Sequence, residues 1–184
     1  MLTNALSLLN RLSPRSGFLL VGLAAWALSI SGLALSYVEQ LEPCPLCIFQ
    51  RLLFMVFGTL ALLAAAFVRS GKGSCRMVGL TLALPCIWGF GVAIYQTLMQ
   101  SAPGFVQECD RAAPGLIEDF VDWLGLYWME HVPFLPDLFF ASGSCSSKEW
   151  VFLGFSLANW AAVFFALFAA FTLMVSGWFM RRLG

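Results

Sequence analysis

Charged side chains are scarce in this sequence. They make up 11% of its 184 residues, while hydrophobic residues make up 60%, and a soluble domain usually carries about 25% charged residues. A chain so poor in charge is not expected to fold as a soluble globule. Its ten basic and ten acidic residues cancel to a net charge of zero, so a basic surface that binds nucleic acid is not expected either.

Histidine is almost absent, since His131 is the single one. It stands between Trp128 and Pro133, as is typical of a polar residue at a membrane interface, and we assign it no role. With one histidine and no second cluster of ligands we expect no metal site. The chain also has no recognisable haem-ligand or dinucleotide-binding motif, so any redox chemistry has to rest on other groups.

The apolar residues gather in four long blocks. Each has about the 20 residues that a helix needs to cross the hydrocarbon core. They occupy residues 18–37, 48–68, 77–99 and 151–180. The first block is longer than the apolar part of a signal peptide, which has about 7–15 residues, so we interpret it as an uncleaved anchor. The sequence predicts an all-α membrane protein, a four-transmembrane-helix bundle that forms one integral-membrane domain over residues 1–184.

The basic residues indicate how the bundle is oriented. Seven of them flank the ends of the blocks that share one side of the membrane: Arg11, Arg15, Arg69, Lys72, Arg76, Arg181 and Arg182. The positive-inside rule makes that side cytoplasmic, with both termini on it. Loops 38–47 and 100–150 then face the periplasm, and they hold all ten acidic residues.

The long outer loop contains a stretch with a helical period. From Leu116 to Trp128 its apolar residues fall on one side and its acidic residues on the other. The apolar side comprises Leu116, Ile117, Phe120, Trp123, Leu124 and Tyr127. This pattern predicts an amphipathic helix that lies in the membrane interface with its apolar face down. The alternative is a helix that packs on a soluble partner.

Six cysteines divide according to the predicted side of the membrane. We expect Cys75, in the inner loop, and Cys86, within the third block, to be unreactive apolar residues. The other four lie on the outer side, where disulfides persist; they are Cys44, Cys47, Cys109 and Cys145. Four cysteines can form two pairs in three ways, and the sequence leaves all three open.

Two of these cysteines stand at the start of the second block. Pro45 suits the first turn of a helix, so Cys47 falls in that turn, where the helix dipole favours a thiolate. Arg51 follows one turn later on the same face, either to stabilise an anion near Cys47 or to anchor the helix end by reaching the interface. Gln96, at a similar depth in the third block, is either an interfacial polar residue or a ligand contact.

A pair at a helix mouth and a second pair on a long loop suggest an electron relay. The loop pair would exchange with a soluble dithiol protein and then with Cys44 and Cys47. An acceptor beside the lipid has to be lipid-soluble and to take two electrons with two protons. A membrane quinone fits these requirements.

The same residues resemble those of a known family. The segment Cys44-Pro45-Leu46-Cys47 followed by Arg51, and the run Phe-Ala-Ser-Gly-Ser-Cys at 140–145 that leads to Trp150, look like DsbB. This family comprises thiol:quinone oxidoreductases of the bacterial inner membrane. The resemblance covers essentially the whole chain.

The resemblance implies a role for each cysteine. Cys109 and Cys145 would form the disulfide that a DsbA-like periplasmic thiol oxidase attacks, with Cys109 in the mixed disulfide. Cys47 would face the quinone, ubiquinone or menaquinone, and Cys44 would be its exchanging partner. Arg51 would support the bound quinone.

One position departs from the family pattern. Gln96 stands where some members carry a histidine, so a protonatable group is missing there, although Gln96 can still hydrogen-bond a quinone oxygen.

Two other functions compete with this interpretation. The chain could be a structural or interaction protein whose outer loops are held by static disulfides. It could also pass electrons in the opposite direction, as in quinone-linked reductases of the vitamin K epoxide reductase type. The motifs around the loop cysteines resemble DsbB more closely.

Overall fold

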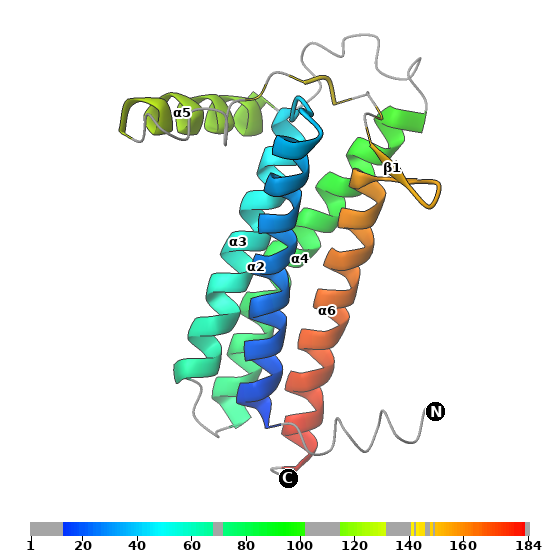
Figure 1. Cartoon of the computed structure of the whole chain (residues 1–184). Coiled ribbons are helices and arrows are strands. Elements are labelled where there is room, and N and C mark those ends of the chain that lie inside the picture. The colour runs from blue at the N-terminus through cyan, green and yellow to red at the C-terminus, as the bar shows by residue number, and fades with distance from the viewer. Residues whose placement is uncertain are drawn as a thin grey trace.

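Four long helices run side by side in the computed structural model, which describes residues 13–67, 72–101, 115–131, 141, 143–145, 148 and 150–182. They are α2 (Pro14–Val38), α3 (Pro45–Phe67), α4 (Lys72–Ser101) and α6 (Leu157–Arg182). The start of α2 and the end of α6 lie at one end of the bundle (Figure 1). At the other end α5 (Gly115–His131) projects sideways from one side of the bundle, and a hairpin of β1 (Val151–Phe152) and β2 (Phe155–Ser156) lies on the opposite side.

Each long helix contains a stretch that is long and apolar enough to cross a membrane. The four stretches have mean hydropathies between 1.9 and 2.1, and they are Arg15–Val38, Pro45–Phe67, Met77–Ser101 and Leu157–Val175. Large apolar side chains such as Leu84 and Trp88 point outward and are more than 60% exposed, as a lipid-facing surface requires. The prediction of an all-α, four-helix membrane protein is confirmed.

The interior of the bundle is held by close helix contacts and stacked rings. Gly22 and Gly58 let α2 and α3 approach so closely that a Cβ at Gly22 would lie 3.0 Å from the carbonyl oxygen of Gly58. Small residues serve this purpose in membrane bundles. Phe54 of α3 stacks on Phe165 of α6 at 3.9 Å between ring centroids. These contacts bring α2, α3 and α6 together below the outer end.

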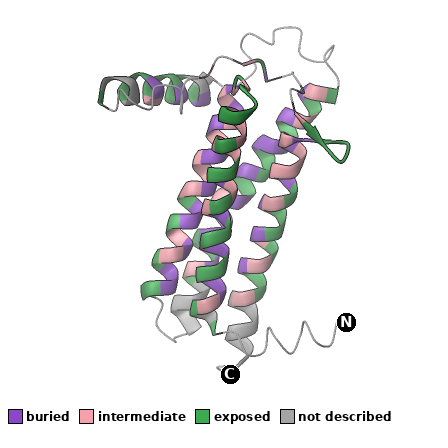
Figure 2. Ribbon diagram, in the orientation of Figure 1, coloured by how far each residue is buried: buried purple, intermediate pink, exposed green. Residues whose placement is uncertain are grey.

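The fourth span is predicted to begin at residue 151, which is six residues too early. Residues 151–156 form the hairpin, in which Val151 pairs with Ser156 and Phe152 with Phe155, and α6 begins only at Leu157. Leu153 and Gly154 have φ of 53° and 82°, the positive values that a two-residue hairpin turn of type I′ needs. The hairpin is largely exposed (Figure 2). Hydropathy alone could not distinguish these apolar strands from a helix.

The helix predicted in the outer loop is present as α5, but its apolar side is divided. Ile117 of the predicted apolar side is buried in a cluster with Leu46 and Ile48 of α3, together with Val121, which the prediction had not included. Phe120, Trp123 and Tyr127 remain exposed, with Trp123 at 58%, and each ring of this series packs on the next. One apolar edge of α5 therefore docks on the bundle, and contact of the aromatic edge with a membrane stays a prediction.

Candidate functional site

The outer end of α3 brings two sulfurs together. Pro45 is the first residue of α3, as predicted, and Cys47 lies in its first turn. Cys44 precedes the helix, and its carbonyl oxygen accepts a hydrogen bond from the N–H of Ile48. The Sγ atoms of Cys44 and Cys47 are 3.0 Å apart, and the Cys44 thiol donates toward Cys47. This proximity suits a pair that alternates between dithiol and disulfide.

The segment that precedes α6 lies directly on this pair. The N–H of Gly143 donates to the carbonyl oxygen of Pro43 at 3.2 Å, and a Cβ at Gly143 would lie 1.9 Å from the carbonyl oxygen of Glu42. Only glycine allows so close an approach. Two residues later Cys145 is buried in the same cluster as Cys44. Hydrogen bonding with Cys145 and Cys47, together with burial, raises the pKa of the Cys44 thiol.

Three of the four predicted redox cysteines therefore meet at one place. Cys109 lies outside the described residues, so its pairing with Cys145 stays a prediction. Cys86 is buried within α4 in the bundle core, away from this cluster. The structure places Cys145 next to Cys44. The sequence alone left open which cysteine lies beside Cys44.

An amide network supports the two sulfurs from α4. Gln96 is 2% exposed, and its Nε2 donates to Cys44 Sγ at 3.3 Å and to Cys47 Sγ at 3.1 Å. Its Oε1 accepts a hydrogen bond of 2.8 Å from Nε2 of Gln50 on α3. Gln96 is thus a sulfur contact, and its predicted contact with a quinone remains a prediction.

Arg51 is a buried cation one turn below Cys47. Its side chain is 7% exposed, and its Nη2 donates to Ser36 Oγ, while its backbone carbonyl accepts from Ser29 Oγ. Among the described residues, no carboxylate is paired with this guanidinium. A cation buried this deeply needs an anion or a carbonyl group as a partner.

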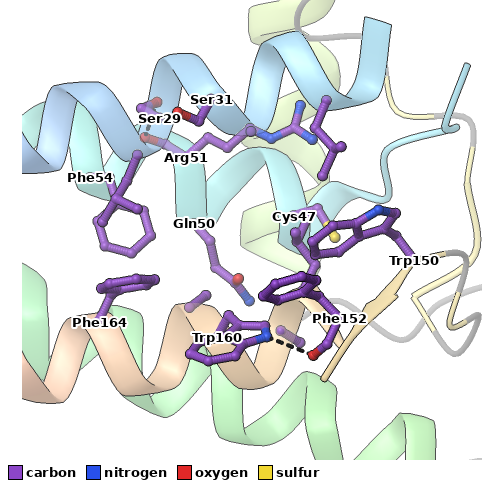
Figure 3. A pocket seen from close by; sticks show the side chains of 16 residues that line it. Ser29, Ser31, Cys47, Gln50, Arg51, Phe54, Trp150, Phe152, Trp160 and Phe164 are labelled. Atoms are coloured by element: carbon purple, nitrogen blue, oxygen red, sulfur yellow. Dashed lines mark hydrogen bonds between the residues drawn. The ribbon is translucent and has the colours of Figure 1, made fainter. Parts of the chain in front are cut away.

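A cavity of about 330 Å³ adjoins Cys47, Gln50 and Arg51. Its walls come from α2, α3, α6, β1 and Trp150, which precedes β1. In Figure 3, Gln50 points into the space between Phe152 and Trp160, and Arg51 runs along α2 toward the end where Cys47 and Trp150 lie. The lining is mostly apolar and aromatic; it includes Leu28, Leu35, Phe54, Trp150, Phe152, Trp160 and Phe164.

Comparison with known proteins agrees with this site. A family model described as "Disulfide bond formation protein DsbB" matches residues 14–175. The chain belongs to the DsbB family.

Curated relatives named "Disulfide bond formation protein B" extend the likeness over nearly the full length. That of Dechloromonas aromatica is 40% identical over 174 residues, which are 94% of this chain and 96% of the relative. That of Chromobacterium violaceum is 38% identical over 176 residues, covering 94% and 98%. That of Azoarcus sp. is 38% identical over 159 residues, covering 85% and 88%. No solved structure matches the chain. Membership of the DsbB family makes this a multi-pass membrane protein of disulfide bond formation.

Two features of this DsbB-family site were missed in the sequence. Gln50 stands out there only as a polar break in the second apolar block, although a polar residue beside Arg51 was a usable signal. The aromatic wall made by Phe152 and Trp160 was missed because residues 151–156 are apolar enough to be predicted as part of a helix. The indole N–H of Trp160 donates to the carbonyl oxygen of Phe152 at 3.1 Å, and this ties the hairpin to α6.

Proposed function

We propose that the chain is a protein-dithiol:quinone oxidoreductase that reoxidises a DsbA-like periplasmic partner and passes the electrons to a membrane quinone. The observation that carries this proposal is the continuous series Cys145, Cys44 and Cys47, which ends at a cavity containing Arg51. A static staple does not require a third cysteine beside the pair or a buried cation beneath it. Family membership in disulfide bond formation supports the same function.

The relay is balanced as two successive thiol–disulfide exchanges. A thiolate of the reduced partner attacks the Cys109–Cys145 disulfide at Cys109, and the partner leaves oxidised while Cys109 and Cys145 become thiols. Cys145 then attacks Cys44 of the Cys44–Cys47 disulfide, which frees the Cys47 thiolate. Closure of the Cys109–Cys145 bond leaves Cys44 and Cys47 reduced. Each exchange transfers two electrons, and the protons remain on the thiols or pass to solvent.

The cavity fits a quinone head group. Its volume of about 330 Å³ falls within the range of about 300–1,000 Å³ typical of ligand sites. Arg51 would donate a hydrogen bond to a carbonyl oxygen of the quinone, and the aromatic side chains would pack on its ring. Cys47 lies at the wall of the cavity. When bound, a quinone supplies an acceptor for two electrons and two protons, which restores the Cys44–Cys47 disulfide. Turnover with each quinone in turn decides between ubiquinone and menaquinone.

The location follows from the distribution of charge. The helix ends that carry the basic residues lie together at the end of the bundle opposite α5 (Figure 1). By the positive-inside rule this end faces the cytoplasm of a bacterial inner membrane. The cysteine cluster at the other end would then face the periplasm, where a DsbA-like protein can reach it.

The test is quinone reduction by the purified protein. Reduced DsbA-like protein is the donor, and a soluble ubiquinone or menaquinone analogue is the acceptor. We expect turnover that Cys47→Ser abolishes, because no sulfur would then face the cavity. Cys86→Ser is the matched control, since Cys86 lies in the core, and it should retain turnover. Full activity of Cys47→Ser would refute the proposal.

Thiol trapping separates the relay from its competitors. In the static alternative the disulfides would not redistribute when a mild dithiol is added, whereas in the relay they would. In a reductase of the vitamin K epoxide reductase type, quinol would reduce an oxidised partner faster than quinone accepts electrons from a reduced one. Measuring both directions with the same pair of substrates decides between them.

A further inference from the structure

Two buried amides meet between α3 and α4, and the orientation of one is set by the other. Gln50 and Gln96 are 5% and 2% exposed, so neither can rely on bulk water for hydrogen bonds. The Nε2 of Gln50 donates to Oε1 of Gln96 at 2.8 Å. With its acceptor engaged, Gln96 directs its NH₂ group at Cys44 Sγ and Cys47 Sγ, at 3.3 and 3.1 Å. An amide nitrogen has only donors to offer, and here both sulfurs lie on the donor side of the Gln96 amide.

The opposite orientation of Gln96 would be costly in the reduced enzyme. It would place Oε1, an acceptor, against the sulfurs and would bring its NH₂ group against that of Gln50. A thiolate accepts hydrogen bonds and is repelled by a carbonyl oxygen. In the observed arrangement Cys47 Sγ accepts from the Cys44 thiol and from Gln96, and Arg51 lies one turn below. Cys47 Sγ therefore has two hydrogen-bond donors, and it is the sulfur at the cavity.

We propose that Gln50 is a positioning residue: it holds the Gln96 amide with its N–H donors toward the cysteine pair and thereby stabilises the thiolate of Cys47. Gln50 itself touches neither sulfur through a hydrogen bond and acts through Gln96. The use of that thiolate in turnover rests on the proposed function, whereas the arrangement of the amides does not. Removing the Gln50 donor would free Gln96 to rotate and would weaken its bonds to the sulfurs.

The test measures the reactivity of Cys47 in the reduced protein, without quinone or protein partner. Iodoacetamide is the probe, and the modified cysteine is assigned by tandem mass spectrometry. The rate near neutral pH is divided by the rate at strongly alkaline pH, where every accessible thiol is ionised, so that changes in access cancel. Gln50→Met keeps the length of the side chain but has no N–H donor. We expect it to lower this ratio about tenfold, the effect of losing a hydrogen bond to a charged group.

A double-mutant cycle distinguishes positioning from a general structural effect. Gln96→Met should lower the ratio by a similar factor, and Gln50→Met should have no further effect in that background, because residues that act through one another are not additive. A full effect of Gln50→Met in the Gln96→Met background would overturn the proposal. So would an unchanged ratio in a folded Gln50→Met protein.

Controls keep these outcomes separate from misfolding and from the proposed function. Gln100→Met makes the same chemical change one turn further along α4, where Gln100 accepts a hydrogen bond from Ser156, and should leave the ratio unchanged. Helical content and thermal unfolding report folding, and Gln50→Leu replaces Gln50→Met if the latter does not accumulate.

Quinone reduction is assayed separately. If the cycle behaves as expected without quinone turnover, the positioning role holds and the proposed function fails. If turnover occurs and the cycle is additive, the proposed function holds and the positioning role fails.

Discussion

Gly143 offers a direct test of whether Cys145 delivers electrons to Cys44. A Cβ at this position would lie 1.9 Å from the carbonyl oxygen of Glu42, whereas a carbon and a carbonyl oxygen in contact stand at least about 3.3 Å apart. Gly143→Ala must therefore shift the segment by about 1.4 Å, the difference between these two distances. The hydrogen bond from the Gly143 N–H to Pro43 would be lost in the process.

The displacement should slow the exchange between Cys145 and Cys44 more than it changes the reactivity of the Cys44–Cys47 disulfide. Misplacing reacting groups by about 1 Å can cost on the order of 100-fold in rate, and Cys145 is two residues from Gly143. We therefore expect quinone reduction driven by a reduced DsbA-like protein to fall by about 100-fold. Quinone reduction driven by dithiothreitol should be retained, because this small dithiol can reduce the Cys44–Cys47 disulfide without Cys145.

The assay compares the two donors on the same preparation. Gly91→Ala is the matched control, since a Cβ at Gly91 meets nothing within 4 Å, and both rates should stay near those of the unmodified protein. If Gly143→Ala keeps its protein-driven rate within a few-fold, the contact between Cys145 and Cys44 is not part of the relay. If both rates fall together, the substitution has damaged the site as a whole and the reasoning from local displacement is wrong.

Three further outcomes are expected. Arg51→Met should raise the apparent KM for quinone about tenfold or more, the effect of losing a hydrogen bond from a charged group, and should leave the KM for the protein donor unchanged; an unaltered quinone dependence would make Arg51 a helix anchor. Gly89→Ala should lower stability in detergent by about 1–3 kcal/mol, because its Cβ would lie 2.4 Å from Phe165; an unchanged melting temperature would contradict that packing. The raised pKa of Cys44 means that the folded, reduced protein holds this proton more tightly than the unfolded chain. Stability should be full below the ordinary cysteine pKa of about 8.5 and fall as pH rises above it, and Cys44→Ser should flatten this alkaline decline in melting temperature.

The local features of this protein were determined by its sequence. The four helices follow from the length and apolar content of continuous blocks, because each helix satisfies its own backbone hydrogen bonds in lipid. The start of α3 follows from Pro45, and the place of Cys47 in its first turn from counting two residues on. The depth of Arg51 in an apolar block predicted that it needs a partner or must reach the interface, and the structure shows that its side chain is buried.

The start of α6 after the hairpin could not be predicted from the local sequence. Residues 151–156 are as apolar as the helix that follows, and the type I′ turn at Leu153 and Gly154 became evident only from their positive φ values. The division of the apolar side of α5 has a similar cause. Periodicity indicates which residues are apolar together, but only the neighbouring helix decides that Ile117 and Val121 are buried while Trp123 remains exposed.

The site itself was decided by tertiary structure. Cys145 lies beside Cys44 although about a hundred residues separate them in sequence, and the close passage of Gly143 over Glu42 produces that contact. Gln96 faces the sulfurs because Gln50, on another helix, occupies its carbonyl oxygen. Hydrogen bonds depend on distances between side chains, and distances between segments far apart in the chain are set by how helices pack. The sequence thus determined which groups were available, and the packing of the helices determined which of them meet.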